Sequence, residues 1–457
     1  MPARQRASRA CRRPDGNVRS CIRPGALLRS LVQVRDHEVR SLLWAFLYAF
    51  ALLCGYYVLR PVREEMGIAR GAEQLPWFFL GTFVATLAAV PLYSWVVARK
   101  PRRRIVPVVY HFAAANLLLF WVLLRFGLVP RPALAPVFFV WLSVFNLFVV
   151  SVFWSLMADL FTPEQGKRLF GFIAAGGSAG GLLGPLVAAF LTRRIGQAQL
   201  LLLAATLVEL AVVCVSQLAH PRTQRHAQAP IGGGIWAGFV GVARSRFLQG
   251  IAGQTLATTV TATFLYLQQA RIVQAAALDP ATRTMLFARI DLCVNLVALL
   301  VQAAGTGRLL ARAGLAVGLS VTPLCNALGC AALALAPRFG VLMAVQAVRR
   351  AAHYAVERPS REVLFTVVPD EDKYKAKSFL DTFVYRGGDL LGSWAFRGLG
   401  ALGLAIRGTA LAAIPLSAAW LVLVLFLARR ATLSAHEAPG VSPDRGAGGR
   451  EPAAPVA

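Results

Sequence analysis

Long apolar runs constrain this chain more than any other feature of its sequence. About twelve runs of roughly 20 residues alternate with short polar loops, and each run can cross the roughly 30 Å hydrocarbon core of a bilayer. Of the 457 residues, 57% are hydrophobic and 15% are charged, whereas soluble proteins carry about 25% charged residues. The sequence therefore predicts an all-α membrane protein.

The predicted spans form two groups of six, separated by a basic linker rich in proline and glycine. The spans of the first group are residues 41–59, 75–97, 105–124, 134–157, 171–191 and 198–218. Those of the second group are residues 248–270, 284–306, 314–336, 338–358, 379–404 and 409–428.

This division predicts five segments, of which two are six-helix bundles. They are a basic, disordered cytoplasmic tail (1–40), the N-terminal bundle (41–218), a cytoplasmic linker that ends in an amphipathic surface helix (219–247), the C-terminal bundle (248–430) and a second disordered tail (431–457).

Basic residues in the loops predict how the chain crosses the membrane. Even-numbered loops carry more Lys and Arg than odd-numbered loops, and the first tail is rich in arginine. Cytoplasmic loops are enriched in these residues, so we expect a multi-pass, monomeric protein of the inner membrane with both termini in the cytoplasm. The net charge of +27 is then accounted for by contacts with anionic lipid headgroups, and nucleic-acid binding is not expected.

A glycine-rich stretch, KRLFGFIAAGGSAGGLLGP at residues 167–185, places Gly176, Gly180 and Gly184 at every fourth position, directly before Pro185. On a helix these glycines share one face, which a neighbouring backbone can approach closely. Glycines alone indicate simple packing. A similar cluster, GGDLLG at 387–392, follows roughly 208 residues later, and the first spans of the two groups start about 207 residues apart. The two offsets agree and predict a transporter built from two similar halves.

Ionisable residues lie inside the predicted spans of the second half, where each costs about 2.5–3.5 kcal/mol unless it faces a cavity or a partner. One interpretation is that they pair with one another and hold the bundle together. The other is that they line a central aqueous cavity, where arginine grips carboxylate or phosphate with forked hydrogen bonds. In that case the candidate anion-binding residues are Arg289, Arg349, Arg350, His353 and Arg386, and the candidate coupling or gating residues are Asp291, Glu357, Asp381 and Asp389.

Helical spacing adds detail to these candidates. Asp381, Tyr385 and Asp389 are predicted to share a face, and Arg386 can reach Asp389 at i+3. Pro359 is expected to end or bend the tenth span.

The first span is followed by a charged segment, GYYVLRPVREEMG at residues 55–67, in which Pro61 is expected to break the helix. Arg60, Arg63 and Glu64 are therefore candidates for a gate or a substrate contact. Alternatively, the two arginines simply extend to lipid headgroups.

Three segments of the sequence resemble one family. YYVLRPVREEMG, VSVFWSLMADLF and KRLFGFIAAGGSAGGLLGP are similar to segments of the bacterial relatives of the ATP/ADP translocase family, within the major facilitator superfamily. The resemblance implies nucleotide exchange by alternating access. Family members with this activity use buried lysines and glutamates, whereas the lysines of this chain lie in loops or at helix ends and arginines occupy its spans. The stretch before Pro185 is also similar to the glycine-proline signature of facilitator-type antiporters.

The sequence lacks signs of other chemistry. It contains no phosphate-binding G-x-x-x-x-G-K-[ST] loop, and its seven cysteines form no C-x-x-C pair. We therefore expect neither an enzyme nor a metal or cofactor site. The prediction is a secondary transporter for an organic anion, possibly a nucleotide, working by exchange or ion coupling. Two alternatives stay open: a proton-coupled exporter of hydrophobic or cationic compounds with a net acidic cavity, and a lipid-handling or non-transporting membrane protein.

Overall fold

The structure is a computed structural model that describes residues 34–35, 37–99, 102–218, 235–303, 306–365, 368, 376–377 and 379–437. Every regular element in these ranges is a helix. Nine of the described helices are long and apolar enough to cross a membrane. Three further helical segments are more polar and complete a bundle of about twelve, as the sequence predicts for an all-α membrane protein.

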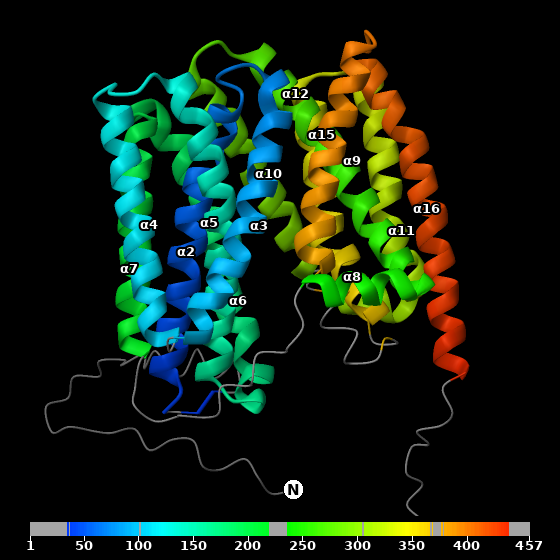
Figure 1. Cartoon of the computed structure of the whole chain (residues 1–457), viewed down its shortest axis with the longest axis horizontal. Helices are drawn as coiled ribbons and strands as arrows, with labels where there is room; N and C mark the ends of the chain where they lie inside the picture. Colours follow the sequence, from blue (N-terminus) through cyan, green and yellow to red (C-terminus); the bar gives the residue numbers. More distant parts are fainter. Residues whose placement is uncertain are drawn as a thin grey trace, which may run out of the picture.

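The helices form two side-by-side groups joined by a linker (Figure 1). The first group is α2 (Val39–Gly67), the short η1 (Ala72–Gln74), α3 (Leu75–Arg99), α4 (Arg102–Arg125), α5 (Arg131–Leu160), α6 (Pro163–Ile195) and α7 (Gln197–Leu218). The second is α9 (Arg246–Ala276), α10 (Pro280–Ala303), α11 (Thr306–Leu335), α12 (Phe339–Ala352) with α13 (Arg358–Leu364), α15 (Tyr385–Ala401) and α16 (Ile406–Glu437). Two π-helical turns, η2 (His353–Glu357) and η4 (Leu380–Val384), precede α13 and α15.

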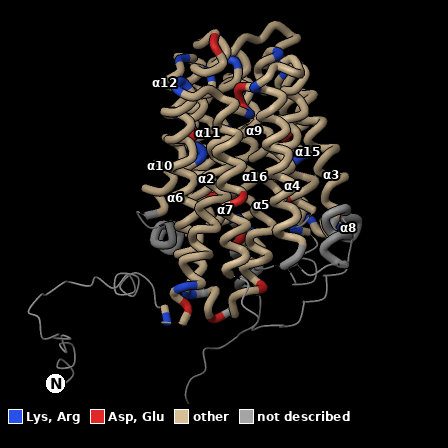
Figure 2. The backbone as a smooth tube through the Cα atoms, turned by 90° about the vertical axis from the view of Figure 1, so that its left-hand side faces the viewer, with Lys and Arg blue, Asp and Glu red and all other residues tan. Residues whose placement is uncertain are grey.

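Helix α2 begins and α16 ends at the same end of the molecule, at the bottom of Figure 1. We call this the terminal end and the opposite one the far end. Charged residues are denser at these two ends than along the middle of the bundle (Figure 2). This distribution is typical of a protein whose middle layer contacts hydrocarbon.

The glycine stretch packs α6 directly against α2. A Cβ atom at Gly180 would lie 2.5 Å from the carbonyl oxygen of Phe50, and one at Gly184 would lie 2.7 Å from that of Cys54. A Cβ atom at Gly176 would lie similarly close to the carbonyl oxygen of Phe46. The backbones therefore touch along three successive helical turns, as small residues allow in membrane helices. Pro185 stays inside α6, which is continuous.

The second glycine cluster makes the equivalent contact in the second half. Gly388 and Gly392 of α15 lie against Thr259 and Val260 of α9. Since α2 begins at Val39 and α9 at Arg246, the first helices of the two halves start 207 residues apart. Both glycine clusters thus seat a late helix on the first helix of its own half, as expected of an internal repeat.

We expect Gly180→Ala to destabilise the protein by about 1–3 kcal/mol or more, because the added methyl group must push α6 away from the α2 backbone. The matched control is Gly171→Ala in the same helix, where an added Cβ meets no atom within 4 Å and where alanine should stabilise by up to about 1 kcal/mol. Thermal unfolding of both variants in detergent measures the difference. Equal unfolding midpoints would contradict the close backbone contact.

Two expectations about helix ends are wrong. Helix α2 does not break at Pro61 but continues to Gly67, since a proline removes one backbone hydrogen bond and membrane helices tolerate this when neighbouring helices pack around them. Helix α16 extends to Glu437, beyond the predicted start of the tail at residue 431. Residues 1–33, 219–234 and 438–457, where the remaining tail and linker predictions fall, lie outside the described residues.

The amphipathic segment of the linker forms a separate helix, α8 (Ile235–Arg244). Ser245 ends it and caps α9, because its hydroxyl accepts a hydrogen bond from the backbone N–H of Leu248 at 3.3 Å. The ring of Phe239 packs edge-on against Phe379 at 5.8 Å between centroids. Helix α8 therefore lies against the second half near the terminal end (Figure 1).

At the terminal end, Glu38 joins the start of α2 to the start of α6. Its carboxylate is 3% exposed and accepts hydrogen bonds from the side chains of Gln165 at 3.0 Å and Arg168 at 2.9 Å. Burial raises the pKa of Glu38, but these hydrogen bonds and one from the backbone of Arg35 outweigh it and lower the pKa to about 2. Glu38 is therefore ionised and paired at neutral pH.

Candidate functional site

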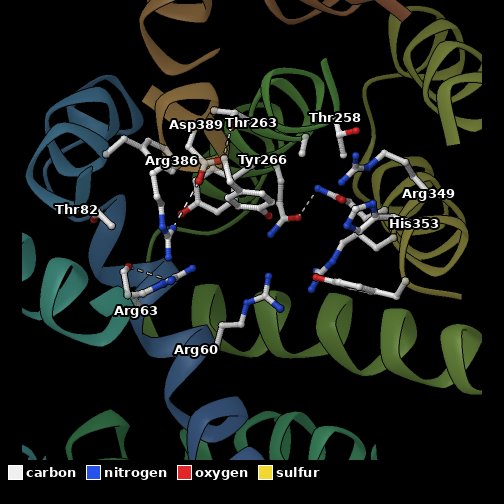
Figure 3. A pocket seen from close by; sticks show the side chains of 18 of the residues that line it. Arg60, Arg63, Thr82, Thr258, Thr263, Tyr266, Arg349, His353, Arg386 and Asp389 are labelled. Carbon is white, nitrogen blue, oxygen red and sulfur yellow. Dashed lines mark hydrogen bonds and ion pairs between the residues drawn. The ribbon is translucent and has the colours of Figure 1, made fainter. Parts of the chain in front are cut away.

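A cavity of about 180 Å³ lies between the two halves. Helices α2, α3 and α5 contribute one side of it, and α9, α12, η2 and α15 contribute the other (Figure 3). Both halves therefore build the site, as in transporters whose substrate binds at the interface of two repeats.

The cavity lining is strongly basic. Among the described residues, five arginines line it, against a single acidic residue, Asp389. Two of the arginines, Arg63 and Arg386, lie on one side, and Arg349 lies across the space beside His353, with Arg60 between them (Figure 3). The arginines are Arg60, Arg63, Arg349, Arg350 and Arg386.

The continuous helix α2 brings Arg60, Arg63 and Glu64 into the protein interior. The Nη2 group of Arg63 is paired with Glu64, and its Nη1 group donates to the hydroxyl of Ser143 at 3.2 Å. The guanidinium of Arg63 also lies over the ring of Phe139, 4.9 Å from its centroid. Because the helix does not end at Pro61, Arg60 and Arg63 line the cavity and do not extend to the headgroups.

Asp291 of α10 joins the halves through two arginines. Its Oδ1 atom lies 3.1 Å from Arg60 of the first half and 2.9 Å from Arg350 of the second. Asp291 is 3% exposed, and Arg350 is 6% exposed. Arg60 also lies 3.6 Å from Glu64, which pairs with Arg63 as well, so three arginines share two buried carboxylates and the cluster keeps excess positive charge.

The side chain of Arg349 makes no hydrogen bond or ion pair within the described part of the chain. It is 6% exposed, and its Nε and Nη1 atoms are buried without a partner. The Nη2 atom of neighbouring Arg350 is also buried and unsatisfied. A buried, unpaired guanidinium is costly, so a ligand that accepts these hydrogen bonds would relieve that cost.

The π-helical turn η2 carries a histidine–carboxylate pair. His353 lines the cavity, and its Nδ1 atom lies 2.8 Å from Oε2 of Glu357, while the hydroxyl of Thr258 donates to Oε1 at 2.9 Å. Glu357 is 1% exposed and lies behind the histidine. π-helical turns occur often at functional sites, and this one accommodates Pro359, which stands in the first turn of α13.

Arg386 and Asp389 form the expected pair on α15. The Nη1 atom of Arg386 lies 3.5 Å from Oδ2 of Asp389, and the hydroxyl of Thr263 donates to Oδ1 at 3.2 Å. Both charged residues line the cavity.

Two of the sequence candidates lie elsewhere. Arg289 is on the exposed side of α10, because it is two residues from Asp291 and helical residues two apart do not face the same way. Asp381 is 44% exposed and pairs with Arg361 at 3.0 Å. It does not share a face with Asp389 because the π-helical turn η4 shifts the helical register between them.

The lining also contains neutral polar residues that charge patterns alone do not reveal. Gln346 donates to Gln269 at 2.8 Å, and Tyr266, Thr82 and Ser143 complete this part of the wall. The sequence does mark Gln346, since it follows directly after the uncharged run 339–345 and lies four residues before Arg350.

The halves are joined at the far end by polar contacts that lie away from the cavity. Gln197 of α7 donates to the carbonyl oxygen of Pro280 at 2.8 Å and to the hydroxyl of Thr284. The backbone N–H of Ala72 donates to Gln274 at 3.0 Å. These contacts come from the ends of the helices, and they hold the far end of the two halves together.

Comparisons with known proteins show which solved structures share this architecture. No protein-family model matches the chain, and no curated protein sequence matches it. Several solved transporter structures do match. A bacterial homologue of the iron transporter ferroportin, in an inward-facing state, gives a TM-score of 0.63 at 12% identity, covering 85% of this chain and 99% of that one. The nucleoside transporter NupG gives 0.60 at 14% identity, with coverage of 86% and 99%.

A bacterial homologue of the human lysosomal transporter Spinster, in an inward-facing and unoccupied conformation, gives a TM-score of 0.56 at 14% identity, with coverage of 88% and 98%. At these identities the similarity establishes the fold. The chain therefore has the major-facilitator-like fold of multi-pass membrane transporters, with the basic cavity at the interface of its halves.

Proposed function

We propose that this protein is a secondary active transporter that works by alternating access and binds an organic anion in the central cavity. The substrate class is a small molecule that carries phosphate or carboxylate groups. Arg349 and Arg350 form the core of the proposed binding site, and Arg60, Arg63, His353 and Arg386 complete its wall.

The observation that carries the proposal is the unsatisfied guanidinium of Arg349. Its Nε and Nη1 atoms and the Nη2 atom of Arg350 are buried without acceptors, and both residues line the cavity. Arginine forks match the paired oxygens of phosphate and carboxylate. Such an anion supplies both the missing acceptors and the missing negative charge.

The alternative functions predict different cavities. An exporter of cationic compounds requires a net acidic cavity, whereas arginines outnumber acids here by five to one among the lining residues. A non-transporting protein predicts that the charges pair fully in a bundle without a cavity, and Arg349 does not fit that description. The anion transporter accounts for both features.

Coupling is assigned to the charged pairs beside the arginines. His353 with Glu357, and Asp389 with Arg386, each combine a cavity-facing group with a partner that can exchange a proton or a salt bridge. Asp291 and Glu64 act as gating residues, since each holds arginines that would also contact the substrate. Asp381 and Arg289 take no part in the proposed site.

The terminal end is assigned to the cytoplasm of a bacterial inner membrane, on the basis of the arginine-rich tail and loops. In that orientation the polar contacts of Gln197 and Ala72 close the outer side of the protein. The cavity would then exchange its contents with the cytoplasm, and opening the far end would require these contacts to break.

Within the anion class, nucleotide exchange is the finer proposal. It is supported by the resemblance of residues 56–67, 150–161 and 167–185 to bacterial relatives of the ATP/ADP translocase family. Two arginine groups facing one another across the cavity suit a ligand with several negative charges (Figure 3).

Thermal-shift screening of the purified full-length protein tests the proposal. ATP, ADP, glycerol 3-phosphate and a lysophospholipid should be compared with tetraphenylphosphonium at equal ionic strength, and the best ligand then assayed by counterflow in proteoliposomes. We expect an anion to give the largest saturable rise in the unfolding midpoint and to exchange across the membrane. Stabilisation by the cation alone, or an absence of counterflow for every anion, would contradict the proposal.

A further inference from the structure

A second cavity, of about 260 Å³, lies at the far end and is separate from the central cavity in its lining residues. One wall comes from η1 and the start of α3, in the first half, and the other from α9 and α15, in the second. It therefore exists only while the two halves are together at this end. We call it the far-end cavity.

Arg271 is the main charged group in this cavity. Its guanidinium lies over the ring of Phe396, 4.7 Å from the centroid, and a Cβ atom at Gly400 would lie 3.0 Å from its Nη2 atom. It makes no hydrogen bond or ion pair with any residue in the described ranges. Stacking fixes the plane of the guanidinium but leaves its donors available, an arrangement suited to binding a planar or tetrahedral oxyanion.

Arg397 supplies the second charge. Its Nη1 atom donates to the backbone carbonyl oxygen of Glu73, across the interface between the halves, at 3.3 Å. Its guanidinium also lies 5.4 Å from the ring centroid of Trp394. A single neutral acceptor leaves the charge of Arg397 uncompensated.

The only acidic residue among the lining residues is Glu73, which is exposed and forms no ion pair within the described chain. Two arginines against one carboxylate give the far-end cavity a net positive charge. The carboxylate of Glu73 would repel an anion, so its removal should strengthen anion binding.

Two exposed tryptophans lie beside the cavity, one from each half. The rings of Trp77 and Trp394 are 5.0 Å apart and nearly perpendicular, and the residues are 50% and 37% exposed. Exposed tryptophans gather where a membrane protein meets the headgroup layer. The far-end cavity is therefore at a level where phosphate arrives either from a lipid headgroup or from solution.

We propose that the far-end cavity binds a phosphate oxyanion between Arg271 and Arg397, and that the bound phosphate holds the far end closed. A ligand that contacts both halves in this conformation and loses one of them on opening must stabilise the closed form. The site goes beyond the transport function proposed above, because it does not use the central arginines.

The test uses the full-length Arg349→Gln variant, delipidated and purified in detergent. The substitution weakens phosphate binding at the central cavity. Inorganic phosphate is titrated against chloride of equal ionic strength while thermal unfolding and hydrogen exchange are measured. We expect a saturable rise in the unfolding midpoint and slower exchange in residues 68–76 and 271–278. Protection confined to one half would contradict the bridging role.

Three substitutions address the site directly. Arg271→Gln and Arg397→Gln should each weaken phosphate binding at least tenfold, whereas Glu73→Gln, at an exposed position, should strengthen it severalfold. If Arg271→Gln does not fold, Arg271→Lys, which keeps the charge without the fork, should weaken binding by a smaller factor. An unchanged response in these variants would overturn the proposal.

A lipid arm identifies the source of the phosphate. Nanodiscs of phosphatidylcholine alone are compared with nanodiscs that also contain phosphatidylglycerol. A higher unfolding midpoint with phosphatidylglycerol that Arg271→Gln abolishes would assign the site to a lipid headgroup, and a response to inorganic phosphate alone would assign it to a soluble anion. A response to neither would reject the site. All of these measurements use the Arg349→Gln background. A negative result therefore rejects the far-end site without testing the transport function proposed above.

Discussion

Arg349→Gln should strongly weaken anion binding and transport while leaving the empty protein at least as stable as the unsubstituted one. Arg349 carries an unpaired, buried charge, so a neutral side chain removes an unfavourable term from the folded state. The same change removes charge-assisted hydrogen bonds to the ligand, each worth about 1.5–3 kcal/mol. Losing two of them weakens binding by about 100-fold or more. Unfolding midpoints and ligand titrations measure both effects on the same protein.

The matched control is Arg289→Gln. Arg289 carries the same charge within the same half but lies on the exposed side of α10, so its substitution should leave affinity within about twofold. Arg349→Lys should retain part of the affinity, since lysine supplies the charge without the forked geometry. A large loss of stability in unliganded Arg349→Gln would show that Arg349 holds the bundle together, and it would contradict its role as a ligand-binding residue.

Hydropathy predicted most of the fold because each apolar run must satisfy its backbone hydrogen bonds within one helix. The positions of the helices and the two-half arrangement followed from that requirement and from the equal offsets of the glycine clusters and the first spans. The continuation of α2 beyond Pro61 was not predicted. Tyr57 to Gly67 stay helical through Pro61 because of packing by other helices, and a local rule for proline does not contain that information.

Side-chain spacing predicted the site only where the helix is regular. Arg386 and Asp389 meet at i+3 as expected. Asp381 was assigned to the wrong face because the local sequence does not predict the π-helical turn in which it lies. The pairing of Arg60 with Asp291 joins residues 231 positions apart in different halves, and only the tertiary arrangement reveals it.

Asp291→Asn should destabilise the empty protein by about 3–5 kcal/mol, because it leaves the buried guanidinium groups of Arg60 and Arg350 without their shared carboxylate. The proposed substrate should restore much of this loss, since an anion in the cavity can replace the missing negative charge. The ligand-induced rise in the unfolding midpoint is therefore expected to be larger in Asp291→Asn than in the unsubstituted protein. Thermal unfolding with and without the best anion from the screen measures this difference.

The control for this prediction is Asp381→Asn, which removes a carboxylate that is 44% exposed from its pair with Arg361. Such pairs contribute about 0–1 kcal/mol, so stability and ligand response should both be nearly unchanged. If Asp291→Asn loses stability that no anion restores, Asp291 serves only to join the halves. If the anion restores it, the carboxylate and the substrate compete for the same arginines, and release of Asp291 from Arg60 then couples binding to separation of the halves.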